Sequence, residues 1–273
     1  MAITLQSVAF GAESGYALLS APVTIEDWWL TAVALGGQGR YAQARAALNV
    51  VDRRTAGLAG DGDRVYASLS ASTRASFLRQ TGWHRKASYD DGRALAIVAG
   101  CGDSPELVAA VCDALTGLAA DALGQGRLAL GWRLLELCAA RIHRSESWSA
   151  QLWRQLIRLE WVSAELGLAG GDFTAALGHA DRAVELAAGC ESLRHRVKSN
   201  LLRCAALTGF DPGQAATLAR EVFDDCRSSG LLPLAWASSM LIEGVSGIAT
   251  SPDSAALGAA VAARGGVFRD MSL

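Results

Sequence analysis

Lysine is nearly absent from this 273-residue sequence. Lys86 and Lys198 are its two lysines, so arginine supplies 23 of the 25 basic residues. Together with the abundance of Ala and Gly, this bias is typical of a high-GC bacterial genome, and we expect a bacterial source. Asp and Glu number 27, which gives a net charge of −2. This balance argues against a globally basic nucleic-acid-binding protein.

Targeting signals are also missing. Residues 1–23 contain no Lys or Arg, whereas a secretory signal needs a positive region before its apolar stretch. The stretch from 231 to 249 is the one worth testing as a membrane span, but it contains Pro233, Glu243 and several small polar residues. A carboxylate near the middle of a span is costly, so we predict a buried helix there. We expect a cytoplasmic protein that does not bind membranes.

Paired cysteine motifs are missing as well. None of the six cysteines forms a C-x-x-C pair, and none has zinc-site spacing to a histidine. We therefore expect the cysteines to be small buried hydrophobic residues in a reducing compartment, and we expect neither a disulfide framework nor a metal site. The cysteines are Cys101, Cys112, Cys138, Cys190, Cys204 and Cys226.

Catalytic motifs are not found either. Residues 37–42 and 124–129 partly match the dinucleotide fingerprint, but each follows a predicted helix instead of the strand that the fingerprint requires. We interpret both as turns between helices. The sequence has no phosphate-binding loop, no G-x-S-x-G elbow and no pair of histidines four residues apart. It therefore predicts no catalytic residue, metal or cofactor, and a protein that is not an enzyme.

Strand signals are poor and helix signals are abundant, so we predict an all-α fold. Thr24 with Asp27 forms a capping-box pattern, and a capping residue precedes proline at 104–105, 211–212 and 251–252. We expect an N-terminal segment at 1–23, one helical domain at 24–264 and a tail at 265–273 that is either loose or docked on the last hairpin. The predicted helices cover 24–37, 40–54, 63–80, 87–99, 104–124, 127–144, 147–169, 172–188, 190–207, 211–229, 231–248 and 252–264.

The turns between the helices repeat. Residues 39–44, 126–131 and 171–176 share Gly, a charged residue, a bulky apolar residue, two free positions and a small residue. With glycines at 82 and 209, the intervals are 43, 44, 45 and 38 residues, a spacing typical of stacked helical repeats. We expect the glycine to end one helix in a left-handed conformation. The small residue should then allow the next helix to approach closely.

The best-matching repeat, Trp28 to Val51, resembles the tetratricopeptide repeat (TPR). The resemblance implies a TPR-like right-handed superhelix of about six antiparallel helical hairpins, with repeats longer than the standard length. Such hairpins are similar to the helical arms of bacterial signalling and transcription-regulatory proteins. The residues at the family's packing positions are Trp28, Ala32, Leu35, Gly39, Tyr41, Ala44 and Leu48.

In a TPR-like stack the first helix of each hairpin lines the concave surface, and this resemblance gives a candidate binding groove. A groove rich in arginine and tryptophan suits an acidic or extended peptide, which favours a non-catalytic adaptor or regulatory scaffold. The alternative is that these arginines only solubilise helix faces. Counting back from the turn glycines gives the positions expected to face the groove, and we add Arg154 from the helix that carries Arg158. The candidate binding residues are Trp29, Arg79, Arg154, Arg158, Trp161, Glu165, Arg196 and Arg203.

Two other functions stay open. The arginine-rich strip at 194–203, together with Arg141, His143 and Arg144, could bind RNA or DNA, with steep salt dependence. A small ligand could instead sit in the aromatic concavity beside Trp161 and Arg158. Because end hairpins of an array expose an apolar face unless they are capped, we also expect that the chain can self-associate.

Overall fold

The computed structural model describes residues 3–18 and 21–269, and within these ranges the protein is helical and contains no strand. The predicted all-α class is confirmed. The described residues form thirteen α-helices and a short 3₁₀ helix, Glu146–Trp148. The α-helices are α1 (Leu5–Phe10), α2 (Ile25–Gly37), α3 (Tyr41–Thr55), α4 (Asp61–Gln80), α5 (His84–Ile97), α6 (Pro105–Gly124), α7 (Leu128–Arg144), α8 (Trp153–Ala169), α9 (Phe173–Ala188), α10 (Leu193–Leu207), α11 (Pro212–Ser228), α12 (Leu232–Ser246) and α13 (Ser254–Ala263).

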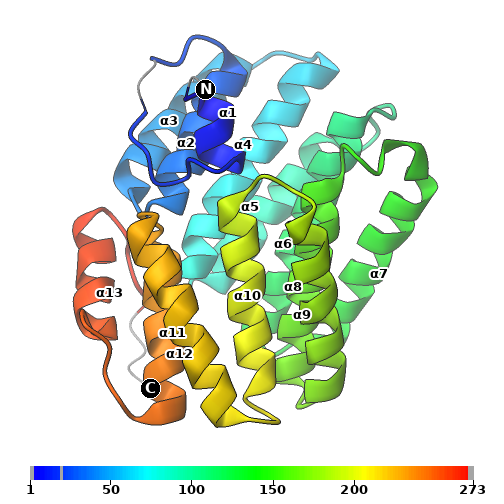
Figure 1. Ribbon diagram of the computed structural model, residues 1–273. Coiled ribbons are helices and arrows are strands. Elements are labelled where there is room, and N and C mark those ends of the chain that lie inside the picture. The colour runs from blue at the N-terminus through cyan, green and yellow to red at the C-terminus, as the bar shows by residue number, and fades with distance from the viewer. Residues whose placement is uncertain (1–2, 19–20, 270–273) are drawn as a thin grey trace.

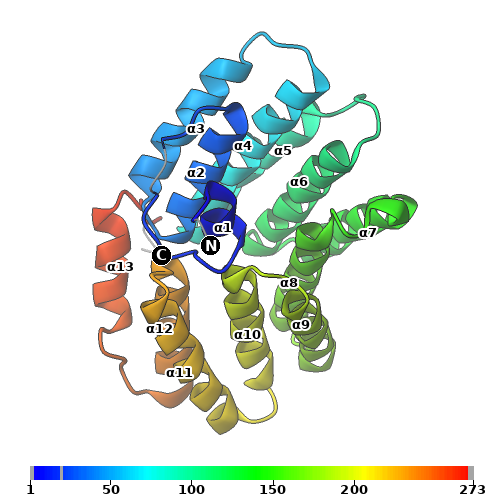
Figure 2. The ribbon, with the colours of Figure 1, turned by 45° about the horizontal axis from the view of Figure 1, so that its top comes forward.

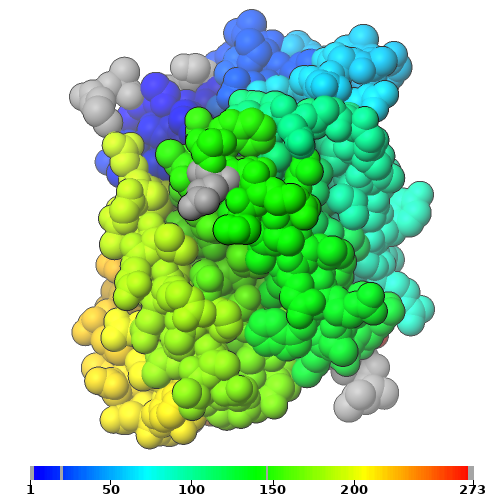
Figure 3. Space-filling model, turned by 90° about the vertical axis from the view of Figure 1, so that its right-hand side faces the viewer, coloured from blue at the N-terminus to red at the C-terminus, as the bar shows by residue number. Residues whose placement is uncertain are grey.

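Consecutive helices pack as antiparallel neighbours from α2 to α12 (Figure 1). Each even-numbered helix in this series also contacts the next even-numbered helix, so α2, α4, α6, α8, α10 and α12 form an inner layer. The odd-numbered helices α3, α5, α7, α9 and α11 lie outside them (Figure 2). Seen from the side of α7, the hairpins follow one another across the surface in sequence order (Figure 3).

The helix starts follow the capping signals in the sequence, with one exception. Thr24 accepts a hydrogen bond from the backbone N–H of Asp27, whose carboxylate accepts one from the N–H of Thr24. Ser104 and Asp211 likewise cap helices whose first residue is proline. The start predicted at Ser251-Pro252 is wrong. Helix α13 begins two residues after the proline, because the side chain of Asp253 accepts a hydrogen bond from the N–H of Ala256 and caps the helix there.

The turn pattern also has its predicted geometry at four of its five glycines. Gly39, for example, has a φ of 74°, and two residues that follow it in α3, Tyr41 and Ala44, are fully buried. Gly209 differs, because its φ is not positive and α11 begins three residues after it, whereas the other four turn glycines precede their helix by two. A Cβ at Gly209 would lie 2.3 Å from the ring of Phe173, so glycine is needed there for a close approach.

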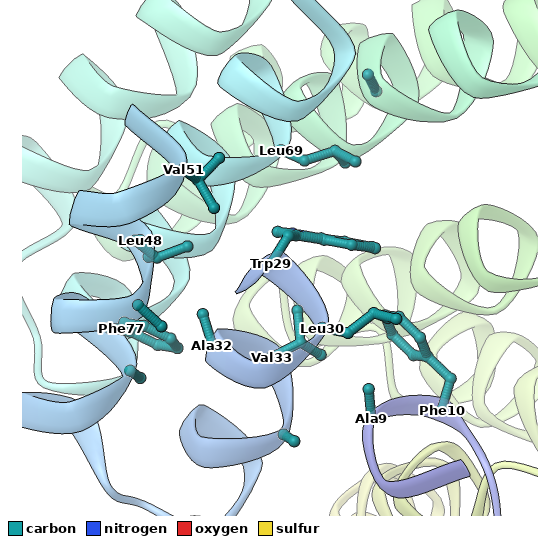
Figure 4. Packing of buried hydrophobic residues seen from close by; sticks show 14 of the residues in the cluster. Ala9, Phe10, Trp29, Leu30, Ala32, Val33, Leu48, Val51, Leu69 and Phe77 are labelled. Atoms are coloured by element: carbon teal, nitrogen blue, oxygen red, sulfur yellow. The ribbon is translucent and has the colours of Figure 1, made fainter. Parts of the chain in front are cut away.

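The N-terminal segment contains a helix that the sequence did not predict. Thr4 and Ser7 form a capping box that starts α1. Helix α1 packs against α2, and its last residue, Phe10, points toward Trp29 and Leu30 (Figure 4). Val8, Ala9 and Phe10 are buried in the largest hydrophobic cluster of the protein. The segment that precedes the array therefore belongs to its core.

The C-terminal residues return to the first helices. The N–H of Ala42 donates to the carbonyl of Arg264, and the indole N–H of Trp83 donates to the carbonyl of Val267. The N–H of Arg269 donates to the carbonyl of Thr81. The described part of the tail, up to residue 269, is thus docked, but on the turn between α4 and α5 as well as on α12, where Phe268 packs on Trp236.

The cysteines form no disulfide. All six are free thiols, and four of them are buried.

One helix could cross a membrane by its length and composition. Within the described residues, α6 is long and apolar enough to do so, and most of it is buried among the neighbouring helices. The stretch from 231 to 249 that we tested as a span forms α12, which packs on α11.

Candidate functional site

An aromatic cluster joins α1 to three helices of the inner layer. It consists of Phe10 of α1, Trp29 of α2, Trp153 and Trp161 of α8, and His195 of α10. The ring centroid of Phe10 lies 5.6 Å from that of Trp29, 6.4 Å from that of Trp153 and 6.2 Å from that of His195. His195 stacks on Trp161 at 5.1 Å. Phe10 therefore sits where these helices converge.

Cationic side chains surround this aromatic cluster. The guanidinium of Arg154 lies 4.9 Å from the ring centroid of Phe10 and 5.6 Å from that of Trp29. The guanidinium of Arg194 lies 5.7 Å from the ring of Phe10, and the ammonium of Lys198 lies 4.6 Å from that of Trp161. Contacts of this kind are attractive because the face of an aromatic ring carries partial negative charge.

Carboxylates compensate these cations only in part. Asp113 of α6 accepts a 2.9 Å hydrogen bond from Arg154 and lies 3.5 Å from Arg158, and Glu165 lies 3.4 Å from Lys198. Arg194 donates to the backbone carbonyl of Val33. We call Arg154, Arg158, Arg194 and Lys198 the inner cations. In these contacts, the four positive charges face two carboxylates, Asp113 and Glu165.

The surplus of positive charge affects the titration of two members of the site. Burial, together with repulsion from Arg154 and Arg158, lowers the pKa of Arg194 to about 10. Burial and the neighbouring inner cations also lower the pKa of His195 well below its usual value. His195 is therefore neutral at physiological pH, and its Nδ1 forms a 2.7 Å hydrogen bond with the hydroxyl of Ser192.

A second charged group lies apart from the aromatic cluster, between α4, α5 and α6. Arg79 forms ion pairs of 2.8 Å with Asp91 and 2.7 Å with Asp121, and donates to the backbone carbonyl of Gly117. Both carboxylates are fully buried. We call these three charged residues the Arg79 network. Two carboxylates share one guanidinium here, and one oxygen of each has no hydrogen-bond partner.

The Arg79 network should make stability depend on pH. Burial, together with repulsion from Asp121, raises the pKa of Asp91 to about 7, although Arg79 and Arg158 oppose the shift. Folded protein then binds this proton more tightly than unfolded protein does, so the free energy of unfolding should fall as pH rises from about 4 to about 7. We expect a slope of up to about 1.4 kcal/mol per pH unit from this group.

Urea unfolding of the wild type and of Asp91→Asn at several pH values measures this slope. Other carboxylates titrate in the same range, so the readout is the difference between the two proteins. That difference should vary between pH 4 and 7 and be constant above pH 8. Parallel pH profiles for the two proteins would show that Asp91 does not titrate as described.

The structure brings together five of the eight predicted site residues. Trp29 and Trp161 belong to the aromatic cluster, and Arg154 contacts its rings. Arg158 shares Asp113 with Arg154, and Glu165 pairs with Lys198. Arg79 is instead held within its own buried network.

The two predicted arginines of α10 contact other groups. Arg196 donates to the carbonyl of Cys190, and Arg203 pairs with Asp181 of the outer helix α9. The residues of α10 that reach the cluster are Arg194, His195 and Lys198. Counting back from Gly209 therefore selected the wrong residues of α10, although Gly209, like Gly171, follows the preceding helix by two residues.

Sequence reasoning also missed Phe10 and Asp113. Nothing in the repeat pattern marks Phe10, because it lies outside the repeats. Asp113 did carry a signal, since it is a lone carboxylate in the middle of the apolar run from 107 to 120. Such a residue is rarely buried unless it is paired.

No protein-family model, no curated protein and no solved structure matches this chain. The chemistry of the site must therefore be derived from its own residues. Within residues 3–18 and 21–269, no group of three or more His, Cys, Asp or Glu side chains is placed to hold a metal ion. What the site does combine is aromatic surface with partly uncompensated guanidinium groups. These groups are suited to bind aromatic side chains and carboxylates.

Proposed function

We propose that this protein is a non-catalytic interaction module, an adaptor or regulatory scaffold that binds an acidic protein segment on its inner layer. We also propose that its helices form a TPR-like right-handed superhelix of about six hairpins. The alternation of inner and outer helices and the close packing after Gly39 support this description of the fold.

The observation that carries the proposal is the occupied inner surface. A short segment of the protein's own chain, α1, is already bound there by contacts between Phe10, two tryptophans and two arginines. The surface therefore has a shape and chemistry that accept a peptide. The surplus of inner cations favours a peptide with negative charge, because hydrogen bonds from guanidinium to carboxylate are among the strongest in proteins.

The two alternatives receive less support. Of the residues that we considered for nucleic acid, Arg141 pairs with Asp103 and Arg203 pairs with Asp181, while Arg194 and Lys198 face the inner layer. They do not form one continuous strip for phosphates. For a small ligand, a hollow of about 410 Å³ lies between α3 and α13, away from Trp161 and Arg158.

Cross-linking affinity capture from the source organism tests the proposal. The bait is the full chain, either wild type, Arg158→Gln with Lys198→Gln, or the matched control Arg133→Gln with Arg220→Gln, whose two arginines are exposed on outer helices. We expect a partner that the wild type and the control capture equally and that the inner-layer variant captures at least tenfold less. Circular dichroism must show that all three proteins are folded.

Two results would contradict the proposal. One is a partner captured equally by the inner-layer variant, which would move the binding surface elsewhere. The other is a turnover activity of the purified protein that a single substitution abolishes, which would make the protein an enzyme.

A further inference from the structure

Few hydrogen bonds hold α1 on the inner layer, although Val8, Ala9 and Phe10 are buried there. Among the described residues, the backbone of α1 and its C-cap Gly11 forms one hydrogen bond outside its own segment, from the N–H of Leu193 to the carbonyl of Gly11. Just beyond it, the side-chain amide of Gln38 donates to the carbonyls of Ser14 and Tyr16. The helix has six residues, which is far too short to be stable in isolation. It therefore forms because it docks, and it should melt when it is released.

The α1 segment satisfies only part of the site. Phe10 fills the position between the tryptophans and packs under Arg154 and Arg194. From Ile3 to Ala12, however, the segment carries no charged residue. It offers no carboxylate to the inner cations, and Arg194 donates to a backbone carbonyl instead. The α1 segment therefore supplies the aromatic side chain that the site binds, but it supplies no negative charge to the inner cations.

We propose that α1 is an internal competitor for the binding site, and that the partner segment displaces it by presenting an aromatic side chain flanked by carboxylates. This inference rests on the proposed function and names the chemistry of its partner. A tethered segment acts at an effective concentration of about a millimolar or more, so a neutral peptide of the same sequence competes poorly. A peptide with carboxylates beside its aromatic ring gains charge-assisted hydrogen bonds that α1 lacks.

Three synthetic peptides test this. The first has the sequence of residues 3–12, which contains no charged side chain. The second carries Gln6→Glu and Ala12→Glu, two positions on either side of Phe10 that are exposed in the structure. The third adds Phe10→Ala to the second. Fluorescence anisotropy measures the binding of each labelled peptide to the full-length wild type, to full-length Phe10→Ala and to full-length Arg194→Gln.

Matched controls are available in the same chain. Phe210→Ala removes an aromatic ring that is 55% exposed, and Arg133→Gln removes an exposed arginine. Neither residue contributes to the aromatic cluster or the inner cations. Circular dichroism shows whether each variant is folded.

We expect the second peptide to bind the wild type at least tenfold more tightly than the first, and more tightly than the third. The first peptide should bind Phe10→Ala at least tenfold more tightly than the wild type, and Phe210→Ala should not have this effect. Arg194→Gln should weaken binding of the second peptide at least tenfold, and Arg133→Gln should not.

The inference is overturned if the first two peptides bind alike, or if Phe10→Ala binds no better than the wild type. The capture experiment could also find a partner that depends on Arg158 and Lys198 but binds Phe10→Ala and the wild type equally. That result would support the proposed function and exclude competition by α1. If no peptide binds any of the variants, the inference is overturned. The proposed function is then tested separately by the capture experiment.

Discussion

Replacing Arg79 by leucine should destabilise the protein by about 4 kcal/mol, because it leaves two buried carboxylates without a cation. Asp91 and Asp121 are fully buried, and Arg79 forms an ion pair with each of them. Removing one partner of a buried ion pair strands a charge that burial disfavours. Since folded proteins of this kind are stable by about 5–15 kcal/mol, this loss is a large fraction of the total.

Urea unfolding monitored by circular dichroism measures this loss. The loss should shrink as pH falls toward 5, because protonation of Asp91 relieves part of the stranded charge. Arg133→Leu is the matched control, since Arg133 is exposed on α7, and it should change stability by less than about 0.5 kcal/mol. A loss below 1 kcal/mol for Arg79→Leu, or one independent of pH, would contradict this account of the Arg79 network.

Replacing Gly117 by alanine should cost about 3 kcal/mol, although alanine is the better helix former. An added Cβ at Gly117 would lie 2.2 Å from a carboxylate oxygen of Asp91. That carboxylate cannot move aside easily, because Arg79 holds it. Because Gly117 of α6 has no side chain, α5 can approach closely enough to place Asp91 in the Arg79 network.

Gly92→Ala is the matched control for this substitution. Gly92 lies inside α5, and a Cβ there would meet nothing within 4 Å. We expect this control to stabilise the protein by about 0.5–1 kcal/mol, which is the intrinsic preference of a helix for alanine. Equal effects of the two substitutions in thermal or urea unfolding would show that Gly117 is not needed for close packing.

The array itself was predictable from the sequence because its signals are local. Capping residues, turn glycines and apolar spacing place α2 to α13 to within a few residues, except that α8 begins at Trp153 after a short 3₁₀ turn. Helix α1 was not predictable in this way. It is short and outside the repeats, and it depends on burial of Val8, Ala9 and Phe10 against helices distant in sequence.

The candidate site was predictable on α2 and α8 but not on α10. Counting from Gly39 and Gly171 identified Trp29, Arg158 and Trp161, whereas counting from Gly209 identified Arg196 and Arg203 instead of Arg194 and Lys198. The balance of charge was not predictable at all. It depends on Asp113 of α6 reaching across to Arg154 of α8, a contact between residues 41 apart in sequence.

Closure of the chain onto its beginning has a consequence for synthesis. Arg45 donates to the carbonyl of Gly265, a contact between residues 220 positions apart, and Trp83 reaches Val267. The first hairpins therefore emerge from the ribosome long before the residues that cover them. Contacts of such long sequence separation slow folding. We expect the outer edge of α3 and the turn after α4 to stay uncovered until residues 264–269 have been synthesised, and a chain truncated before residue 264 to expose them permanently.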